Sequence, residues 1–251
     1  MPRPGYGAGL EGKPRGLRCR QGLAPNAPRR PSRSLLHGGA THAASGSAGR
    51  HAREKVKTTC PDATASHPLD LVNRNFTADR TNQLWVADFT FVSTWQGFAY
   101  VAFIVDVFSR FIVGWWVSRH MRTDFVLDAL EQALHARQPG RKRLIHHSDR
   151  GSQYVSIRYS ERLGEAGIDP SVGSTGDSYD NAMAKTINGL YKAELVRQHG
   201  LWKSIEALEL KTLHWVTWFN HTRLLEPIGN IPPAEFKALY ERDQKESCKA
   251  A

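Results

Sequence analysis

LWVADFTFVSTWQGFAYVAFIVDVFSRFIVGWWVS, residues 84–118, is the stretch that decides the fold. It divides into three apolar, β-rich runs at residues 84–92, 98–108 and 111–118. A turn at Gly97 separates the first two runs, and the second and third are almost contiguous. Connections this short join neighbouring antiparallel strands. The stretch therefore predicts a three-stranded antiparallel meander.

The sequence after the meander predicts helices and strands in alternation. Leucines recur at helical spacing in residues 122–137, with Thr123 as the expected N-cap. The further expected elements are a strand at 143–149, a helix at 156–167, a strand at 168–173, helices at 180–195 and 204–220, and a turn with a short closing helix within 228–236. This order predicts an α/β fold, with a mixed five-stranded sheet flanked by helices.

The first quarter of the chain has a different composition. Residues 1–57 carry 9 Arg and 3 Lys against 2 Glu, which accounts for the whole formal net charge of +10. Residues 1–66 hold too few apolar side chains to offset the loss of chain entropy on folding. We therefore expect a disordered basic segment and linker at 1–66, a core at 67–240 and a tail at 241–251. The basic segment either favours nucleic acid and anionic surfaces or is an unselected basic tail.

Cysteine content and hydropathy exclude several classes of protein. Cys19, Cys60 and Cys248 are odd in number and far apart, which argues against a zinc finger or a disulfide framework. No run of about 18 apolar residues is present, so no membrane span is expected. The chain start lacks the apolar stretch of a secretory signal. An intracellular, reducing setting is expected.

Two aspartates are the first candidates for chemistry. Asp88 lies among apolar neighbours on the expected central strand, where a charge is costly to bury unless it binds a cation or a partner. Asp149 ends the strand at 143–149, and strand ends commonly carry catalytic groups in α/β folds. Two carboxylates on neighbouring strands could hold a divalent metal. The alternatives are a core arginine partner or a turn-capping role for Asp88 and an ordinary Asp-x-Gly turn at Asp149.

His146 and His147 lie next to each other on the same expected strand. Successive side chains of a strand point to opposite faces, so these two cannot chelate one metal together. One is expected in the core or in a polar network, and the other could contact a metal ligand without binding the metal itself.

Residues 180–195, DNAMAKTINGLYKAEL, predict a helix with two faces. The apolar face consists of Met183, Ile187, Leu190 and Tyr191. The polar stripe consists of Asn181, Lys185, Asn188 and Lys192. From periodicity alone, this polar stripe is a solvated helix face.

Four segments carry a family resemblance: LWVADFT, HHSDRGSQY, DSYDNAMAKTINGLYKAEL and WFNHTRLLEPIGNIPPAEF. They resemble the transposases of bacterial insertion sequences, above all the second-frame (OrfB) product of the IS-three group, over roughly residues 55–240. The resemblance implies a retroviral-integrase-like core with a ribonuclease H-like fold. It also implies action on transposon ends and target DNA, a homo-oligomer assembled on DNA, and a cytoplasmic, nucleoid-associated location in bacteria. An upstream-frame helix-turn-helix protein is a further implied partner.

The resemblance also implies a catalytic site, the DDE triad of two aspartates and a glutamate, which works with Mg²⁺ or Mn²⁺ in phosphoryl transfer. Its aspartates match Asp88 and Asp149. The family places 35 residues between the second and third acids, and that spacing leads to Lys185. A basic residue seven positions further, expected to contact DNA, matches Lys192. The other candidate DNA contacts are Arg150, Arg197 and Lys203, whereas Trp202, Trp215 and Trp218 are interpreted as core residues.

Lys185 conflicts with the implied mechanism. An ammonium group has no lone pair and cannot ligate a metal. About 6 Å from a divalent ion, its repulsion is roughly 5 kcal/mol at an effective dielectric near 20. Lys185 could instead pair with the two aspartates. Glu194 is expected to face away from the site, and Asp177 and Asp180 are expected to have structural or capping roles. We therefore expect a transposase with impaired catalysis and weakened metal binding; the alternative is an inactive DNA-binding or oligomerising remnant.

Residues 1–52 contain no helix-turn-helix pattern, although the resemblance implies one before the core. Their Arg, Pro, Gly and Ala bias is typical of GC-rich DNA read out of frame. The hypothesis is a frameshifted or misstarted copy whose matching frame resumes near Val56. Translating the upstream DNA in the other frames tests this hypothesis.

Overall fold

The computed structural model describes residues 68–140, 142–174 and 181–250. The chain divides by its contacts into two units, Met1–Cys60 and Pro61–Ala251, and every described residue belongs to the second. The segment expected to be disordered, residues 1–66, lies outside the described residues.

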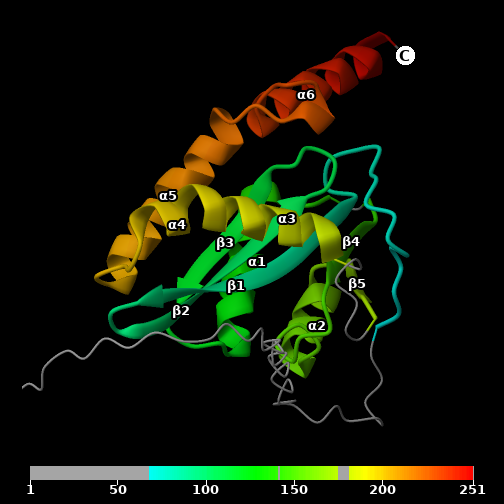
Figure 1. Cartoon of the computed structure of the whole chain (residues 1–251). Coiled ribbons are helices and arrows are strands. Elements are labelled where there is room, and N and C mark those ends of the chain that lie inside the picture. Colours follow the sequence, from blue (N-terminus) through cyan, green and yellow to red (C-terminus); the bar gives the residue numbers. More distant parts are fainter. Residues whose placement is uncertain (1–67, 141, 175–180, 251) are drawn as a thin grey trace, which may run out of the picture. The chain divides into compact units, whose positions relative to one another are not determined.

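A mixed five-stranded sheet forms the centre of the second unit, which confirms the predicted fold class (Figure 1). Its strands are β1 (Leu84–Thr94), β2 (Gly97–Asp106), β3 (Ile112–Ser118), β4 (Leu144–Ser148) and β5 (Ile168–Val172), in the spatial order β3-β2-β1-β4-β5. The first three strands form the predicted antiparallel meander, and β4 and β5 join it in parallel pairing.

Helices cover both faces of the sheet (Figure 1). The helical elements of the described residues are α1 (Thr123–Arg137), α2 (Ile157–Glu165), α3 (Ala182–Tyr191), the π-helical turn η2 (Lys192–Val196), α4 (Arg197–His199), α5 (Ile205–His221), the 3-10 turn η3 (Glu226–Ile228) and α6 (Pro233–Ala250). One apolar core lies between the sheet and α3 and α5, and the other between the sheet and α1 and α2. Among the described helices, none is both long and apolar enough to cross a membrane.

Strand β1 carries apolar side chains on both of its faces, so helices must cover both faces of the sheet. Its side chains alternate between the two faces with a period of two. Val86 and Val92 enter the core beneath α3 and α5, while Trp85 and Ala87 enter the core beneath α1 and α2. All four are buried, as expected for a central strand packed on both sides.

Two expectations about helix ends need revision. Arg122, not Thr123, occupies the N-cap of α1, and its side chain makes no capping hydrogen bond. Thr123 is the first helical residue, so its hydroxyl is past the position from which a cap acts. At the other end of the chain, the segment expected as a tail after residue 240 continues helix α6 as far as Ala250.

Strand β1 is longer than its parallel neighbour β4. The pairing of these two strands runs from Leu84 with Ile145 to Ala87 with Ser148. Beyond Ala87, strand β1 keeps its pairing with β2 but is no longer paired with β4. Asp88 is therefore the first residue of β1 beyond the end of β4, and Asp149 is the residue that follows β4. The topology brings these two acids to the same point on the sheet.

Candidate active site

Asp88 lies on the face of β1 that α3 covers. Its carboxylate is buried and accepts a hydrogen bond from the backbone N–H of Phe89, at 2.9 Å. The side chain of Asn188, on α3, also hydrogen-bonds to this carboxylate. A core arginine, the alternative partner considered for Asp88, is not among the groups that influence it.

Asp149 lies at the start of the loop after β4 and is half-buried. Its Oδ1 accepts a hydrogen bond from the backbone N–H of Gly151 at 3.0 Å, so the Asp-x-Gly turn is present. A Cβ atom at position 151 would lie only 2.9 Å from the same oxygen, which explains the glycine. Asp149 both forms this turn and interacts electrostatically with Asp88, so the two interpretations of this residue are compatible.

Lys185 projects from α3, is half-buried, and interacts electrostatically with Asp88. The structure therefore brings together all three residues that the family resemblance selected: Asp88, Asp149 and Lys185. Asn188, one turn further along α3, is buried beside them. Its Oδ1 atom is buried without a hydrogen-bond partner.

The local electrostatics are dominated by burial and by the second carboxylate. Burial, and next the negative charge of Asp149, raise the pKa of Asp88 from 3.8 to about 7. The Phe89 N–H, the Lys185 ammonium and Asn188 lower the pKa and offset part of that rise. Near pH 7 the buried carboxyl group therefore holds a proton about half of the time.

A third carboxylate does not join this pair within the described part of the chain, where no group of three His, Cys, Asp or Glu side chains could hold a metal. Glu194 faces α5, where it accepts a hydrogen bond from the indole N–H of Trp215 at 3.0 Å and pairs with Arg223. Asp177 and Asp180 lie outside the described residues.

His146 and His147 do point to opposite faces of β4, as predicted. The His146 ring lies 3.1 Å from the Tyr159 hydroxyl of α2, and burial lowers its pKa to about 3, so the ring is neutral. The His147 ring lies 2.8 Å from the Ser171 hydroxyl of β5. Both rings are thus engaged in buried polar contacts within the core.

The polar stripe of α3 faces the sheet more than its periodicity indicated. Asn181 and Asn188 are buried, and Asn181 donates a hydrogen bond to the carbonyl oxygen of Ala87, directly before Asp88, at 2.8 Å. Sequence reasoning placed both asparagines in the stripe but assigned them no role. Their i, i+4 and i, i+3 spacing around Lys185 is the signal that could have identified them.

The four expected DNA contacts lie on different elements of the fold. The Lys192 ammonium lies 4.9 Å from the centre of the Phe91 ring of β1. Arg150 follows Asp149 directly and is exposed, as are Arg197 on α4 and Lys203 before α5. Trp202 and Trp215 are core residues as interpreted, but Trp218 is 42% exposed, because its side of α5 faces away from the sheet.

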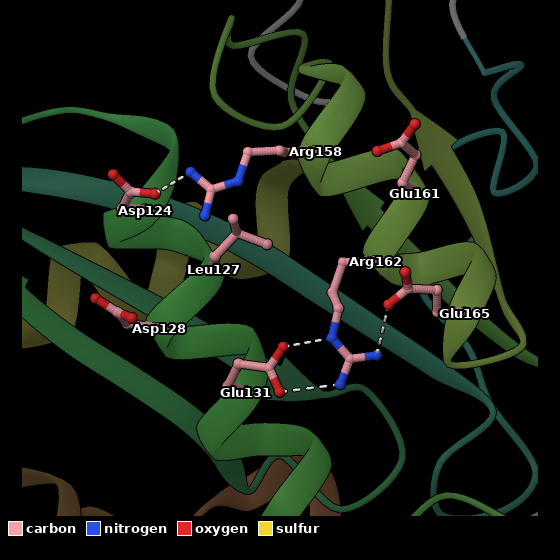
Figure 2. A pocket seen from close by; sticks show the side chains of 8 residues that line it. All are labelled: Asp124, Leu127, Asp128, Glu131, Arg158, Glu161, Arg162 and Glu165. Atoms are coloured by element: carbon pink, nitrogen blue, oxygen red, sulfur yellow. Dashed lines mark hydrogen bonds and ion pairs between the residues drawn. The ribbon is translucent and has the colours of Figure 1, made fainter.

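A separate hollow of about 330 Å³ lies between α1 and α2 and contains none of the expected site residues (Figure 2). Arg158 pairs there with Asp124, and Arg162 pairs with Glu131. These are mostly exposed ion pairs, each worth about 0 to 1 kcal/mol, that join the two helices. We interpret the hollow as the boundary along which α1 and α2 pack against each other.

Comparisons with known proteins identify the family. The integrase core domain model matches residues 78–178, and a second integrase core domain model matches residues 166–233. A protein of Mycobacterium tuberculosis, described as a transposase for insertion sequence element IS986/IS6110, is 56% identical over 188 residues, which are 73% of this chain and 68% of that protein. The chain belongs to the insertion-sequence transposases with an integrase core. The transposase for element IS629 of Shigella sonnei is 60% identical over 74% of this chain and 62% of its own length.

Solved structures support the fold of this transposase. The integrase catalytic core of HTLV-2, solved in complex with magnesium, has a TM-score of 0.50 at 15% identity and covers 64% of this chain and 99% of that one. A simian T-cell lymphotropic virus intasome chain has a TM-score of 0.54 at 15% identity, over 70% of this chain and 60% of that chain. At this identity the likeness establishes the fold alone.

The side chains of this transposase do not fit the three-carboxylate metal site that the family resemblance implies. Asp88 and Asp149 supply carboxylate oxygens, but the position on α3 presents an ammonium group. An ammonium offers three donors and no lone pair, so it competes with a cation for the two carboxylates instead of ligating it.

Proposed function

We propose that this transposase binds the DNA ends of its insertion sequence but is impaired in cutting and joining them. The relatives are named as transposases of insertion sequences, and the family acts on DNA. What supports DNA binding here is the set of basic side chains around the paired aspartates, with Lys192 and Arg150 nearest in sequence to the site. Positive side chains beside a phosphate backbone supply affinity with little dependence on sequence.

One observation carries the impairment: Lys185 interacts with Asp88 at the position where the family resemblance implies a glutamate. Replacing a carboxylate by an ammonium changes the charge of the site by two units. The local charge of Asp88, Asp149 and Lys185 is then −1 when both aspartates are ionised, instead of −3. A site with one net negative charge attracts divalent cations far less than a site with three.

The second candidate function is that of a non-catalytic DNA-binding protein that assembles on transposon ends and blocks an intact copy. The burial of Asn181 and Asn188 favours it over a degraded remnant, because the helix that carries Lys185 still packs closely on the sheet. Under this proposal the DNA-binding face is retained while the chemistry is lost.

A paired binding and cleavage assay tests the proposed function. Duplexes copied from the DNA that flanks the reading frame are incubated with the wild type and with Lys185→Glu, in Mg²⁺ or Mn²⁺, with and without the product of the upstream reading frame. We expect both proteins to bind the duplexes and only Lys185→Glu to cut them. Cutting by the wild type at a rate equal to that of Lys185→Glu would overturn the impairment, and absence of binding by both would overturn DNA binding.

A further inference from the structure

The tip of the β1–β2 hairpin exposes three large aromatic side chains. Phe91 is 57% exposed, Trp95 is 75% exposed and Phe98 is 57% exposed. Side chains of this type are usually buried, so a group of them on the surface indicates a binding site more often than a single exposed residue does. We call Phe91, Trp95 and Phe98 the aromatic hairpin tip.

The aromatic hairpin tip is held in place by the rest of the fold. The Phe91 and Phe98 rings meet edge to face, with their centres 5.5 Å apart. The backbone N–H of Trp95 donates a 2.9 Å hydrogen bond to the carbonyl oxygen of Trp202, and Thr94 forms a parallel β-bridge with the same residue. Trp202 is itself buried. The tip is therefore anchored to the segment between α4 and α5, and its rings need little ordering on binding.

The charge around the tip is positive. The Lys192 ammonium lies 4.9 Å from the centre of the Phe91 ring, within the range of a cation–π interaction. Lys203 directly follows Trp202, the residue to which the tip is anchored. Residues 89–105 and 195–204 contain no Asp or Glu. Asp88, at the candidate active site, and Asp106 flank the first of these ranges, and Glu194, which precedes the second, pairs with Arg223 on the α5 side.

The tip and the candidate active site share one strand. Asp88 and Phe91 both belong to β1, and a rise of about 3.3 Å per residue places Phe91 roughly 10 Å along the strand from Asp88. This part of β1 lies beyond the end of β4. Asp88 and Phe91 are three positions apart, so their side chains leave opposite faces of β1. The Lys192 ammonium, at the end of the helix that carries Lys185, nevertheless lies 4.9 Å from the centre of the Phe91 ring. A DNA end held with its backbone at Asp88 and Asp149 can therefore reach the aromatic hairpin tip past Lys192 within a few nucleotides.

We propose that the aromatic hairpin tip and Lys192 form a stacking platform for unpaired bases at a DNA end, which rests on the proposed function of DNA-end binding. Aromatic side chains beside a cationic backbone groove are the chemistry that binds single-stranded nucleic acid. A second copy of this chain fits the surface less well. A twofold contact through the tip would bring Lys192 and Lys203 of each copy close to their counterparts, without an acid on the tip to offset them.

Binding of three DNA probes tests the platform, in EDTA and at fixed ionic strength. The probes are a blunt duplex, the same duplex with three unpaired nucleotides, and that duplex with abasic residues in the unpaired positions. We expect the unpaired bases to increase the affinity of the wild type about tenfold, and the abasic extension to add little. Trp95→Ala and Phe91→Ala should lose this increase while binding the blunt duplex as the wild type does.

Trp218→Ala is the matched control, because Trp218 is an exposed tryptophan on α5 outside the tip. It should keep the preference for unpaired bases, and thermal unfolding confirms that each variant folds. An equal affinity of the wild type for the blunt and extended duplexes would overturn the platform while leaving DNA-end binding in place. An abasic extension that restores the full gain, or a change of oligomeric state in Trp95→Ala without a change in DNA affinity, would also overturn it. No binding of any probe by the wild type would instead refute DNA-end binding.

Discussion

Asp88 is a buried acid whose charged form destabilises the folded state. Its pKa in the folded protein is about 7, above its ordinary value of 3.8, because burial and Asp149 disfavour ionisation. Between these two pH values the folded state binds more protons than the unfolded state. The stability contributed by the protonated group is therefore complete below about pH 4 and is lost as the pH rises toward 7.

Asp88→Asn tests this electrostatic account, because an amide keeps the shape of the side chain and cannot ionise. From pH 5 to pH 8 we expect the free energy of unfolding to fall by roughly 2 to 4 kcal/mol more in the wild type than in the variant. Urea unfolding at the two pH values measures the difference. The same pH dependence in both proteins would show that Asp88 titrates normally.

At the scale of single residues, the sequence selected Asp88, Asp149 and Lys185, but only through the family resemblance, since composition and periodicity left each with an ordinary alternative. It could not predict that Asn188 lies against Asp88, because a polar stripe on a helix is equally compatible with solvent. Nor could it predict the contact between Lys192 and Phe91, which depends on how α3 and η2 cross the sheet.

At the scale of elements, two interactions set how the helices lie on the sheet. On one face, Asn220 near the end of α5 bonds both backbone groups of Ile112 at the start of β3: its Oδ1 accepts from the N–H at 2.9 Å, and its Nδ2 donates to the carbonyl at 3.1 Å. On the other face, Gly114 lets α1 approach β3 closely. A Cβ atom there would lie 2.2 Å from the Ala129 carbonyl oxygen and 2.9 Å from the Ala133 Cβ.

Asn220→Ala should lower the free energy of unfolding by about 2 to 3 kcal/mol. The substitution leaves a buried N–H and a buried carbonyl of Ile112 without partners, and each unsatisfied group costs about 1 kcal/mol or more. Denaturant unfolding measures the loss. Gln244→Ala is the control, since Gln244 is an exposed amide side chain within α6. A loss below about 0.5 kcal/mol in Asn220→Ala would contradict the account.

Gly114→Ala should cost about 3 kcal/mol or more, because the Ala129 carbonyl belongs to helix backbone and cannot move aside without displacing α1. Gly164→Ala is a matched control, since a Cβ there meets nothing within 4 Å. Comparable thermal unfolding of the two variants would show that α1 does not lie close to β3.

The elements themselves could largely be predicted from local patterns. Apolar, β-rich runs with short connections in residues 84–118 predicted the meander, and leucine spacing predicted α1. The π-helical turn η2 was not predicted, because the periodicity of residues 180–195 is that of an ordinary helix. Trp218 was misassigned to the core because an apolar residue on an amphipathic helix is indistinguishable in sequence from one that lines an exposed groove.

At the scale of the whole molecule, the fold of an integrase core is retained while the charge at its centre is changed. The sheet topology brings two acids together at the end of β4, and α3 adds a lysine to them. Packing depends on the two apolar cores, whereas under the proposed function the metal affinity would depend on the charge at residue 185.

Calorimetric titration of Mn²⁺ into the wild type and into Lys185→Glu tests this central claim most directly. Because the variant restores a third carboxylate and removes a positive charge, we expect it to bind Mn²⁺ at least about tenfold more tightly. Lys192→Glu is the control for charge alone, since it makes the same change two turns along the helix. An affinity for Mn²⁺ that is equal in the wild type and in Lys185→Glu would contradict the account.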